Sequence, residues 1–476
     1  MDNPLKRYLG HFTIQGRRLP GQVTLAGRDS KLEVFSDHHI HLPKEKMQTI
    51  RGVARSGEKV TICNAIGAEM SGSSFYYGTT KHFISLFPHH VAIGPRHIDA
   101  ERKIVSRISF TTTGAINLFY DHGAFGSSSS KNIRRLMPDW AKKDRRKITY
   151  NRIYYYADRG PIVSAKSKDY EIVVFNGGTF SSPSPKGISV KNEVRIALNF
   201  KKAVSLEDAL HAAHEFRILC EFLSHAKQCI QNVRIQHKNS ERQEGEITLH
   251  SSYEESGSGQ EADFRDNLIS GGFHRGEFKQ VIERWLAKPT HASARQRVIQ
   301  NMREEIYTID RLVGAANAFD ILPEFNVAKP LPARATKILS KLKTDAKNLP
   351  VPYNEQILNS LGRVKAQTLR KKIEAHFSSL PKPLKQRLPD MLLVIEHCVR
   401  ARNYFVHGTP PKISVDATHQ QIFFLTDTLE FIFVISELAK CGWKYDRWIK
   451  EPGWGRYRQY LQSYELSLGA FKELIP

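Results

Sequence analysis

The spacing of apolar residues changes along this chain, and that change limits the kinds of domain it can form. Short runs of β-branched and aromatic residues, broken by Gly, Ser and Pro, fill residues 1–200, a pattern typical of strands. Residues 205–232 instead place apolar side chains three or four positions apart, which is the spacing of one helical face. From Glu277 onward the sequence predicts helices. We therefore expect an α+β chain in which a β-rich region precedes a helical bundle.

Two domains and a linker follow from this division. Residues 1–250 are expected to form a sandwich or an open barrel with one long helix, whose N-cap is Ser205. The polar, acidic stretch 251–272 predicts a linker or a mobile loop. Residues 273–476 are expected to form an all-helical bundle. A chain of 476 residues is also too long for one ordinary core.

The local patterns predict individual elements. Strands are expected at Gln22 to Leu25, Val60 to Ile62, Ile104 to Phe110, Ala115 to Tyr120, Ile153 to Tyr156, Tyr170 to Phe175, Val194 to Phe200 and Gly245 to His250. Helices are expected at 205–232, Glu277 to Leu286, Ala292 to Leu322, Tyr353 to Phe377, Pro389 to His407, Gln420 to Lys440 and Arg456 to Leu474. Pro389 suits the first helical position, where a missing N–H is no loss.

Composition excludes several classes of protein. Five cysteines are few and widely spread, and no C-x-x-C pair exists, so neither a disulfide framework nor a zinc cage is indicated. The N-terminal residues lack an apolar stretch and do not predict a signal peptide. The segment Ile422 to Leu438 is strongly apolar, but three carboxylates interrupt it, which predicts a buried helix and no membrane span. We expect a cytoplasmic globular protein.

The net charge of +23 is unevenly placed. Residues 1–200 carry 31 basic against 16 acidic side chains, and residues 291–476 carry 28 against 18. Between them, residues 201–290 carry 12 against 14. Two basic regions joined by a mildly acidic one predict a polyanionic partner, most simply nucleic acid. The alternative is a basic protein that binds no polyanion.

The residues Ala401 to Gly408 place an arginine, an amide and a histidine at the end of an apolar stretch. Arg402 occupies a position of the predicted helical face where a leucine would be expected; the apolar members of that face are Leu392, Ile395, Val399 and Val406. A guanidinium cannot lose its charge, so it needs an anionic partner there. Asn403 and His407 lie four residues apart and share the adjacent face. A phosphodiester would supply the anion.

A purely structural interpretation of these residues stays open. Arg402 could pair with a carboxylate of a neighbouring helix, and Asn403 could cap that helix end. His407 could be a histidine of the last helical turn, where its charge interacts favourably with the helix dipole.

The pattern R-N-x-x-x-H, late in a helical region, resembles the signature of HEPN ribonucleases. The surrounding residues resemble most closely the Apea-like HEPN group of bacterial anti-phage proteins. The N-terminal half resembles the domain that accompanies this group in ApeA-type proteins. That second resemblance rests on Gly10-His-Phe, the strands Leu32 to Phe35 and Lys59 to Ile62, and a strand pair from Ile104 to Tyr120.

Cleavage of RNA without a metal needs a base for the 2′-hydroxyl and a cation for the phosphoryl oxygens. His407 is the natural proton-transfer group and Arg402 the cation, while Asn403 can orient His407 or bind phosphate. The resemblance implies products with a 2′,3′-cyclic phosphate and a 5′-hydroxyl, and no metal or other cofactor. Because the chain has a single motif of this kind, it also implies a homodimer through the helical domain. Asp320 lies where relatives tend to carry an acid, although it could equally be a solvated helix-end carboxylate.

A second candidate for binding RNA is the segment 131–152, with nine basic and two acidic residues. The basic side chains that we select in it are Lys142, Lys143, Arg145, Arg146 and Lys147. Aromatic residues are interleaved with them, which suits single-stranded nucleic acid. A solvated basic loop is an equal alternative. Histidines at positions 38, 39, 41, 89, 90 and 97 lack the spacing of a metal site.

Together these features predict a cytoplasmic, metal-independent HEPN endoribonuclease that acts in anti-phage, abortive-infection defence. Its target would be tRNA or another single-stranded or loop RNA, and its β-rich domain would sense a phage-derived trigger. Two alternatives remain at this point. One is a nucleic-acid-binding protein without catalysis, and the other is a regulatory HEPN-fold partner in a toxin–antitoxin pair.

Overall fold

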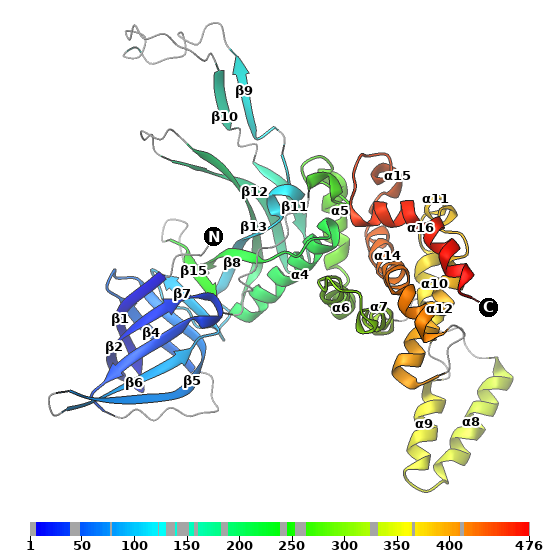
Figure 1. The fold of residues 1–476 in the computed structure, drawn as a ribbon. Coiled ribbons are helices and arrows are strands. Elements are labelled where there is room, and N and C mark those ends of the chain that lie inside the picture. The colour runs from blue at the N-terminus through cyan, green and yellow to red at the C-terminus, as the bar shows by residue number, and fades with distance from the viewer. Residues whose placement is uncertain are drawn as a thin grey trace. The chain divides into compact units, whose positions relative to one another are not determined.

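A computed structural model describes residues 6–38, 48–76, 79–121, 123–129, 139, 152–156, 160–181, 189–238, 245–252, 263–323, 332–363, 367–409 and 414–475. The chain forms two compact units, Met1–Glu283 and Arg284–Pro476. Strands dominate the first, the N-terminal unit, and helices form the second, the C-terminal unit (Figure 1). This confirms the predicted fold class. The linker expected at 251–272 stays a prediction, and residues 253–262 of it lie outside the described part.

The N-terminal unit begins with a small β-barrel. Its strands are β1 (Lys6–Ile14), β2 (Arg17–Leu25), β3 (Lys31–Ser36), β4 (Gln48–Ala54), β5 (Lys59–Tyr76) and β6 (Thr79–Phe87), with the 3-10 turn η1 (Gly27–Asp29) between β2 and β3. Strand β1 pairs with β2 and β4, and β3 pairs with β2 and β6. The long strand β5 pairs with β4 and also with β6. These antiparallel pairings close the six strands into a ring.

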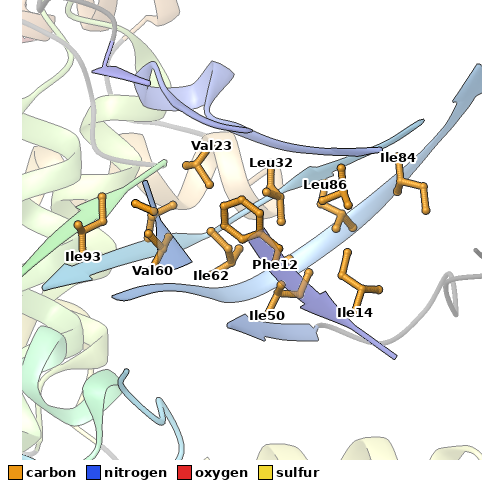
Figure 2. Close-up of a cluster of buried hydrophobic side chains, with 14 residues drawn as sticks. Phe12, Ile14, Val23, Leu32, Ile50, Val60, Ile62, Ile84, Leu86 and Ile93 are labelled. Atoms are coloured by element: carbon orange, nitrogen blue, oxygen red, sulfur yellow. The ribbon is translucent and has the colours of Figure 1, made fainter. Parts of the chain in front are cut away.

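The barrel is filled by side chains around Phe12, which lies at the centre of the cluster in Figure 2. Residues that alternate along each strand point inward, as the period of a half-buried strand requires. Gly52 faces Phe12: a Cβ at Gly52 would lie 2.4 Å from the Phe12 ring. A Cβ at Gly10 would lie 2.3 Å from the Val53 carbonyl oxygen. Glycine is therefore needed where the strands approach each other around the phenyl ring.

The sheet continues beyond the barrel. Its further strands are β7 (His90–Gly94), β8 (Val105–Thr112), β11 (Pro161–Lys166), β12 (Tyr170–Phe180), β13 (Val190–Val204), β14 (Ile230–His237) and β15 (Ile247–Ser251). They run in the order β11-β12-β13-β8-β14-β15-β7, and β7 joins β5. The helix α4 (Leu206–Ser224) and the short helix α1 (Ala115–Leu118) pack on this sheet. A separate hairpin pairs β9 (Phe125–Ser129) with β10 (Arg152–Tyr156).

Two elements of this unit differ from the prediction. The strand expected at Ala115 to Tyr120 is wrong: Gly114 is held by the Gln228 side chain, and the chain then turns into α1. The helix does begin after Ser205, whose hydroxyl accepts from the Asp208 N–H. It ends at Ser224, however, because His225 adopts a left-handed conformation. The chain then enters β14, which belongs to the sheet.

The C-terminal unit is a helical bundle. Its helices are α6 (Ala292–Met302), α7 (Ile309–Ile321), α8 (Ala333–Lys347), α9 (Tyr353–Arg363), α10 (Leu369–Ser378), α11 (Lys382–Gln386), α12 (Met391–His407), α13 (Val415–Gln420), α14 (Ile422–Lys440), α15 (Tyr445–Trp448) and α16 (Arg456–Glu473). The helix α5 (Arg275–Leu286) crosses the limit between the units, with the 3-10 turns η2 (Phe264–Asp266) and η3 (Pro289–His291) on either side.

The sequence predicted fewer and longer helices here. The helix expected from Ala292 to Leu322 divides into α6 and α7, and Thr308 caps the second piece. The helix expected from Tyr353 to Phe377 divides into α9 and α10, which Thr368 caps. Helix α8 was not predicted. Pro389 does not hold the first position of α12, because Asp390 precedes Met391 as the N-cap.

The apolar helix α14 lies in the core of the bundle, as the sequence predicts. Its three carboxylates are each paired with an arginine: Asp427 with Arg456, Glu430 with Arg311 and Glu437 with Arg295. Buried carboxylates need such partners, because unpaired charge in a core is costly. Among the helices of the described ranges, none is long and apolar enough to cross a membrane.

Candidate active site

Helix α12 carries Arg402, Asn403 and His407 in its last two turns. Its buried face is anchored by Met391, Val394, Ile395, Cys398 and Ala401. The helix stops at Gly408, which has φ of 68° and donates its N–H to the Tyr404 carbonyl at 2.8 Å. A positive φ of this kind favours glycine as the helix cap. The motif therefore lies at the free C-terminal end of a helix whose other end is fixed in the core.

The predicted core face of α12 is only partly correct. Ile395 and Val399 are buried, but Leu392 is 50% exposed and Val406 is 44% exposed. The buried stripe is shifted by one position toward Met391, Val394 and Cys398. Arg402 therefore lies at the edge of the core face. A charged group at an edge can reach both a buried partner and solvent.

The guanidinium of Arg402 contacts four side chains. Its Nε donates to Asn317 Oδ1 at 3.0 Å, and its Nη2 lies 3.2 Å from Asp320 Oδ2. Its Nη1 donates to Asn403 Oδ1 at 3.1 Å and lies 2.9 Å from His407 Nε2. Arg402, Asn403, His407 and Asp320 are thus brought together from α12 and α7. The catalytic role predicted for them stays a prediction.

This contact with Arg402 fixes which atom of the imidazole carries the proton. A guanidinium has five N–H donors and no acceptor. His407 Nε2 must therefore accept from Arg402, so the neutral ring carries its proton on Nδ1. The Nε2 lone pair faces the guanidinium, so it can take a proton from a hydroxyl once a phosphate group draws Arg402 away from it.

The cluster is open to solvent. The Arg402 side chain is 15% exposed, the Asp320 side chain is 39% exposed, and His407 lies on the surface. The Arg402–Asp320 pair is therefore a partly solvated ion pair with a single close contact, unlike the two-contact pair of Arg311 with Glu430. Solvent can therefore reach the carboxylate of Asp320. Another anion can reach the guanidinium without unfolding the bundle.

Helix α7 is held firmly at its other end. Arg311 donates through Nε and Nη2 to the two oxygens of Glu430, both at 3.0 Å. The Asn301 amide on α6 donates to the Arg311 carbonyl at 2.8 Å and to Glu430 Oε1 at 2.9 Å. These buried contacts fix α7 against α6 and α14. Asn317 and Asp320, one turn apart on α7, are positioned accordingly.

The sequence did not predict two residues of the cluster, Asn317 and Lys372. Asn317 lies one helical turn before Asp320, in an otherwise apolar stretch, which is the signal that could have identified it. Lys372 of α10 donates from Nζ to the Asp320 carbonyl at 2.8 Å and to the Leu322 carbonyl at 3.4 Å. A lysine at the carboxyl end of a helix satisfies carbonyls that have no partner within the helix. Lys372 thereby places its ammonium at the carboxyl end of α7, the helix that carries Asp320.

The other predicted sites are not part of this cluster. Lys142, Lys143, Arg145, Arg146 and Lys147 lie outside the described residues. Among the histidines considered for a metal, His90 bonds to Ser251 Oγ at 2.8 Å, and His97 to Thr61 Oγ1 at 3.1 Å. Burial lowers the pKa of His90 to about 4, which fits a neutral core histidine. His38 is described, but His39 and His41 are not.

Comparison with known families agrees with the resemblance seen in the sequence. A family model described as ApeA N-terminal domain 1 matches residues 7–285. A second model, described as Apea-like HEPN, matches residues 313–447, from within α7 to α15. Searches among curated proteins and among solved structures give no match. The two models together cover most of the chain, and such domains imply a family of anti-phage HEPN nucleases. The chain therefore belongs to the ApeA-type HEPN proteins.

Proposed function

We propose that this chain is a metal-independent endoribonuclease that cleaves RNA in anti-phage, abortive-infection defence. The observation that carries the proposal is the solvent-open contact between Arg402 and His407, with Asp320 beside them. It combines a fixed cation with an imidazole nitrogen that can accept a proton. RNA cleavage through the 2′-hydroxyl needs both.

In the proposed reaction, the phosphodiester draws Arg402 Nη1 away from His407, and the freed Nε2 takes the proton of a ribose 2′-hydroxyl. The 2′-oxygen then bonds to phosphorus, and the bond from phosphorus to the 5′-oxygen breaks. Arg402 stabilises the charge that develops on the phosphoryl oxygens, with Asn403 as a further ligand. The leaving 5′-oxygen takes a proton from the His407 of a second copy, whose ring is in the imidazolium form, so two copies form one composite site. The products carry a 2′,3′-cyclic phosphate and a 5′-hydroxyl.

Asp320 is proposed to hold Arg402 in place until RNA binds. Its carboxylate and a phosphodiester would use the same guanidinium donors. Exchange of one anion for the other keeps Arg402 paired throughout, which avoids leaving a partly buried charge unpaired. Tight positioning before RNA arrives also lowers the cost of ordering the site.

The experiment is cleavage of a labelled single-stranded RNA by the purified chain in EDTA. Wild type is compared with Arg402→Ala, His407→Ala and the control Arg400→Ala. Arg400 lies two residues from Arg402, but it pairs with Glu396 on another side of α12. We expect the first two variants to lose at least about 100-fold in rate, with melting temperatures close to wild type, and Arg400→Ala to keep its activity.

If the nuclease needs a phage-derived trigger, the purified chain alone will not cut RNA. RNA ends are therefore also mapped in phage-infected cells. Cells that express wild type should accumulate 5′-hydroxyl ends during infection, and cells that express His407→Ala should not. Equal cleavage by wild type, Arg402→Ala and His407→Ala would overturn the proposal. So would the absence of cleavage both in vitro and in infected cells.

A second function is favoured by the Arg402–Asp320 pair itself. In a nucleic-acid-binding protein without catalysis, Arg402 would serve only to join α12 to α7. That reading predicts that Arg402→Ala lowers the free energy of unfolding by about 3 kcal/mol or more, with RNA intact in every sample. A partly solvated pair predicts about 1 kcal/mol or less. The melting curves of the same variants therefore separate the two functions.

The proposal also names the trigger, the RNA substrate and the cellular compartment. The N-terminal unit would sense a phage-derived trigger and release the nuclease, and the RNA would be tRNA or another single-stranded or loop RNA. The basic regions of the chain would attract it. The protein would act in the cytoplasm of the infected cell.

A further inference from the structure

Helix α10 packs against both helices that carry the candidate active site, α7 and α12. Its first turn holds three cations in a row, Arg370, Lys371 and Lys372. The positive end of a helix dipole disfavours cations there, so the stability of α10 does not explain them. Arg370 is neutralised by Glu374 and Glu396. Neither lysine has a carboxylate partner among the described residues.

Lys372 differs from Lys371 because its ammonium group is held in place. Its Nζ donates to the Asp320 carbonyl at 2.8 Å and to the Leu322 carbonyl at 3.4 Å. Residue 372 is half-buried, whereas residue 371 is exposed, and its ammonium makes no such contact within the described part of the chain. An ammonium has three N–H donors. Lys372 therefore keeps one donor for a further acceptor, on a side chain that is already ordered.

The surroundings of the Lys372 ammonium leave it with a net positive charge. Both of its acceptors are neutral carbonyl groups at the carboxyl end of α7. A helix end of this kind carries about half an elementary negative charge, against the full charge of the ammonium. A partly buried cation without a counter-ion is costly. The position therefore favours an anionic ligand.

Asp320 connects Lys372 to Arg402. Its carbonyl oxygen accepts from Lys372, while its Oδ2 lies 3.2 Å from Arg402 Nη2. The two cations thus contact one residue, through its backbone and through its side chain. In the proposed reaction, the phosphate that is cleaved replaces the Asp320 carboxylate at Arg402. A nucleic-acid strand bound there has a second phosphate one nucleotide away, and Lys372 is the ordered cation on the other side of Asp320.

We propose that Lys372 binds the RNA phosphate next to the one that is cleaved, so that a single strand passes over Asp320 with two successive phosphates on Arg402 and Lys372. The inference rests on the proposed function and names a second phosphate subsite for its substrate. A phosphate that does not react is bound equally well before and during the reaction. Its contact therefore lowers KM and leaves kcat nearly unchanged.

The first experiment measures RNA binding over a salt series. Lys372→Gln removes the charge but keeps an amide N–H for the carbonyls, and Lys371→Gln is the matched control with the same change in charge. Both are made in the His407→Ala background, and fluorescence anisotropy follows a labelled single-stranded RNA. Loss of one phosphate contact lowers the slope of log affinity against log salt by about 0.7. We expect this decrease for Lys372→Gln and an unchanged slope for Lys371→Gln.

A purely structural role, in which Lys372 only holds the end of α7, predicts a different result. Lys372→Gln would then lower the melting temperature and leave the salt slope unchanged. Lys372→Arg keeps the charge, so we expect it to keep the slope of the parent protein even where its contacts with the carbonyls change. Circular dichroism checks that every variant is folded at the temperature of the binding measurement.

The second experiment measures steady-state cleavage with His407 present. We expect Lys372→Gln to raise KM by roughly fivefold or more, as loss of a hydrogen bond between charged groups does, with kcat within about twofold of wild type. Lys371→Gln should change neither constant. A fall in kcat at unchanged KM would show that Lys372 acts on the reacting groups through Asp320, and the phosphate subsite would be wrong.

The binding data alone can also overturn the inference. If Lys372→Gln keeps the parent slope, no phosphate lies on Lys372, and the proposed nuclease still stands. If Lys371→Gln lowers the slope as much as Lys372→Gln does, the effect is one of general charge and not of a site. If the His407→Ala protein binds no RNA, the subsite and the proposed function fail together.

Discussion

At the scale of single residues, Arg402 is the most constrained side chain of the candidate site. Each of its nitrogens is used: Nε by Asn317, Nη2 by Asp320, and Nη1 by Asn403 and His407. A phosphate must therefore displace an acceptor. Of the four acceptors, Asp320 is the anion, and its side chain is 39% exposed. Asn317 and Asn403 are neutral amides, and His407 is needed for catalysis, so phosphate is expected to replace Asp320. This leads to a prediction about Asp320 that is opposite in sign for binding and for cleavage.

Asp320→Asn should bind RNA more tightly, because the competing carboxylate is gone. It should cleave RNA more slowly, because Arg402 loses the ion pair that positions it. The carboxylate competes with phosphate for Arg402, and a solvated pair of this kind is worth about 1 kcal/mol, or roughly fivefold in affinity. Affinity is measured by fluorescence anisotropy in a His407→Ala background, where no RNA is cut. Cleavage is measured with His407 present. Weaker binding by the Asp320→Asn variant would show that Asp320 supports the RNA contact and does not oppose it.

Arg402→Lys should retain little activity although it keeps the positive charge. An ammonium cannot present a planar pair of donors to phosphate, nor reach Asn317 and His407 at the same time. We expect a loss of roughly 100-fold in cleavage rate with a change in unfolding free energy of about 1 kcal/mol or less. Arg400→Lys on the same helix is the control. Similar losses in both variants would indicate a general effect on α12.

The sequence predicted the residues of the candidate site that lie on one helix, because their spacing along the chain places them on neighbouring faces. Arg402, Asn403 and His407 follow from spacing on α12, and Asp320 came only from the resemblance to HEPN proteins. Asn317 and Lys372 were missed because their contacts join different helices. Lys372 moreover falls inside a segment that the sequence assigned to one long helix. No local pattern shows that it turns toward the end of α7.

At the scale of elements, the packing of α7 on α6 depends on Gly314. A Cβ at this position would lie 2.3 Å from Asn301 Oδ1, and the Asn301 amide binds both Arg311 and Glu430. Gly314→Ala should therefore lower the free energy of unfolding by about 1–3 kcal/mol. Gly469→Ala on α16 is the control, since no described atom lies within 4 Å of that Cβ. It should be neutral or stabilise by up to about 1 kcal/mol.

Chemical denaturation monitored by circular dichroism measures both glycine variants. If Gly314→Ala is as stable as wild type, Asn301 can move aside without loss of stability, which would contradict the predicted destabilisation. The same variant should also slow RNA cleavage, because α7 positions Asn317 and Asp320. A stable but inactive Gly314→Ala protein would indicate a small shift of α7.

The contact of α10 with α14 should make stability depend on pH through His376. Burial, followed by the nearby Lys440 ammonium, lowers the pKa of His376 from 6.5 to about 3. Its Nδ1 lies 2.7 Å from Ser436 Oγ. The unfolded chain binds a proton below pH 6.5, whereas the folded chain resists it until about pH 3. Stability should therefore fall as pH drops through this window, by up to about 1.4 kcal/mol per pH unit.

Melting temperatures between pH 4 and pH 7, for wild type and His376→Gln, measure this contribution. The variant should lose stability less steeply with falling pH, even if it is less stable at pH 7. The exposed His419→Gln variant is the control. His90 and His250, whose pKa values are lowered to about 4 by burial, are present in every protein and cancel in the comparison. Parallel curves for wild type and His376→Gln would contradict the prediction.

Helix limits were predicted less well than helix positions, and the reason is local. The apolar spacing continues across the breaks before Thr308 and Thr368, so the period alone gives one helix where there are two. Each threonine accepts a backbone N–H three residues ahead, at Arg311 and at Lys371. A threonine is common inside helices as well as at caps, so this signal is weak. Helix α8 was missed because Pro-rich segments surround it.

At the scale of the whole molecule, the change of hydrophobic period was sufficient to predict a β-rich unit followed by a helical one. The closure of the barrel was not predictable, because it depends on β5 pairing with both β4 and β6. Such pairings join strands through the register of distant residues, which no short window contains.

Charge distributed over the whole chain should make RNA binding sensitive to salt, which fluorescence anisotropy measures over a salt series. With a net charge of +23, RNA binding releases counterions, and for single strands the affinity falls with a slope of about 0.7 per phosphate contact on a log–log plot. With about three contacts, raising salt from 50 to 200 mM should weaken RNA binding by His407→Ala roughly tenfold or more.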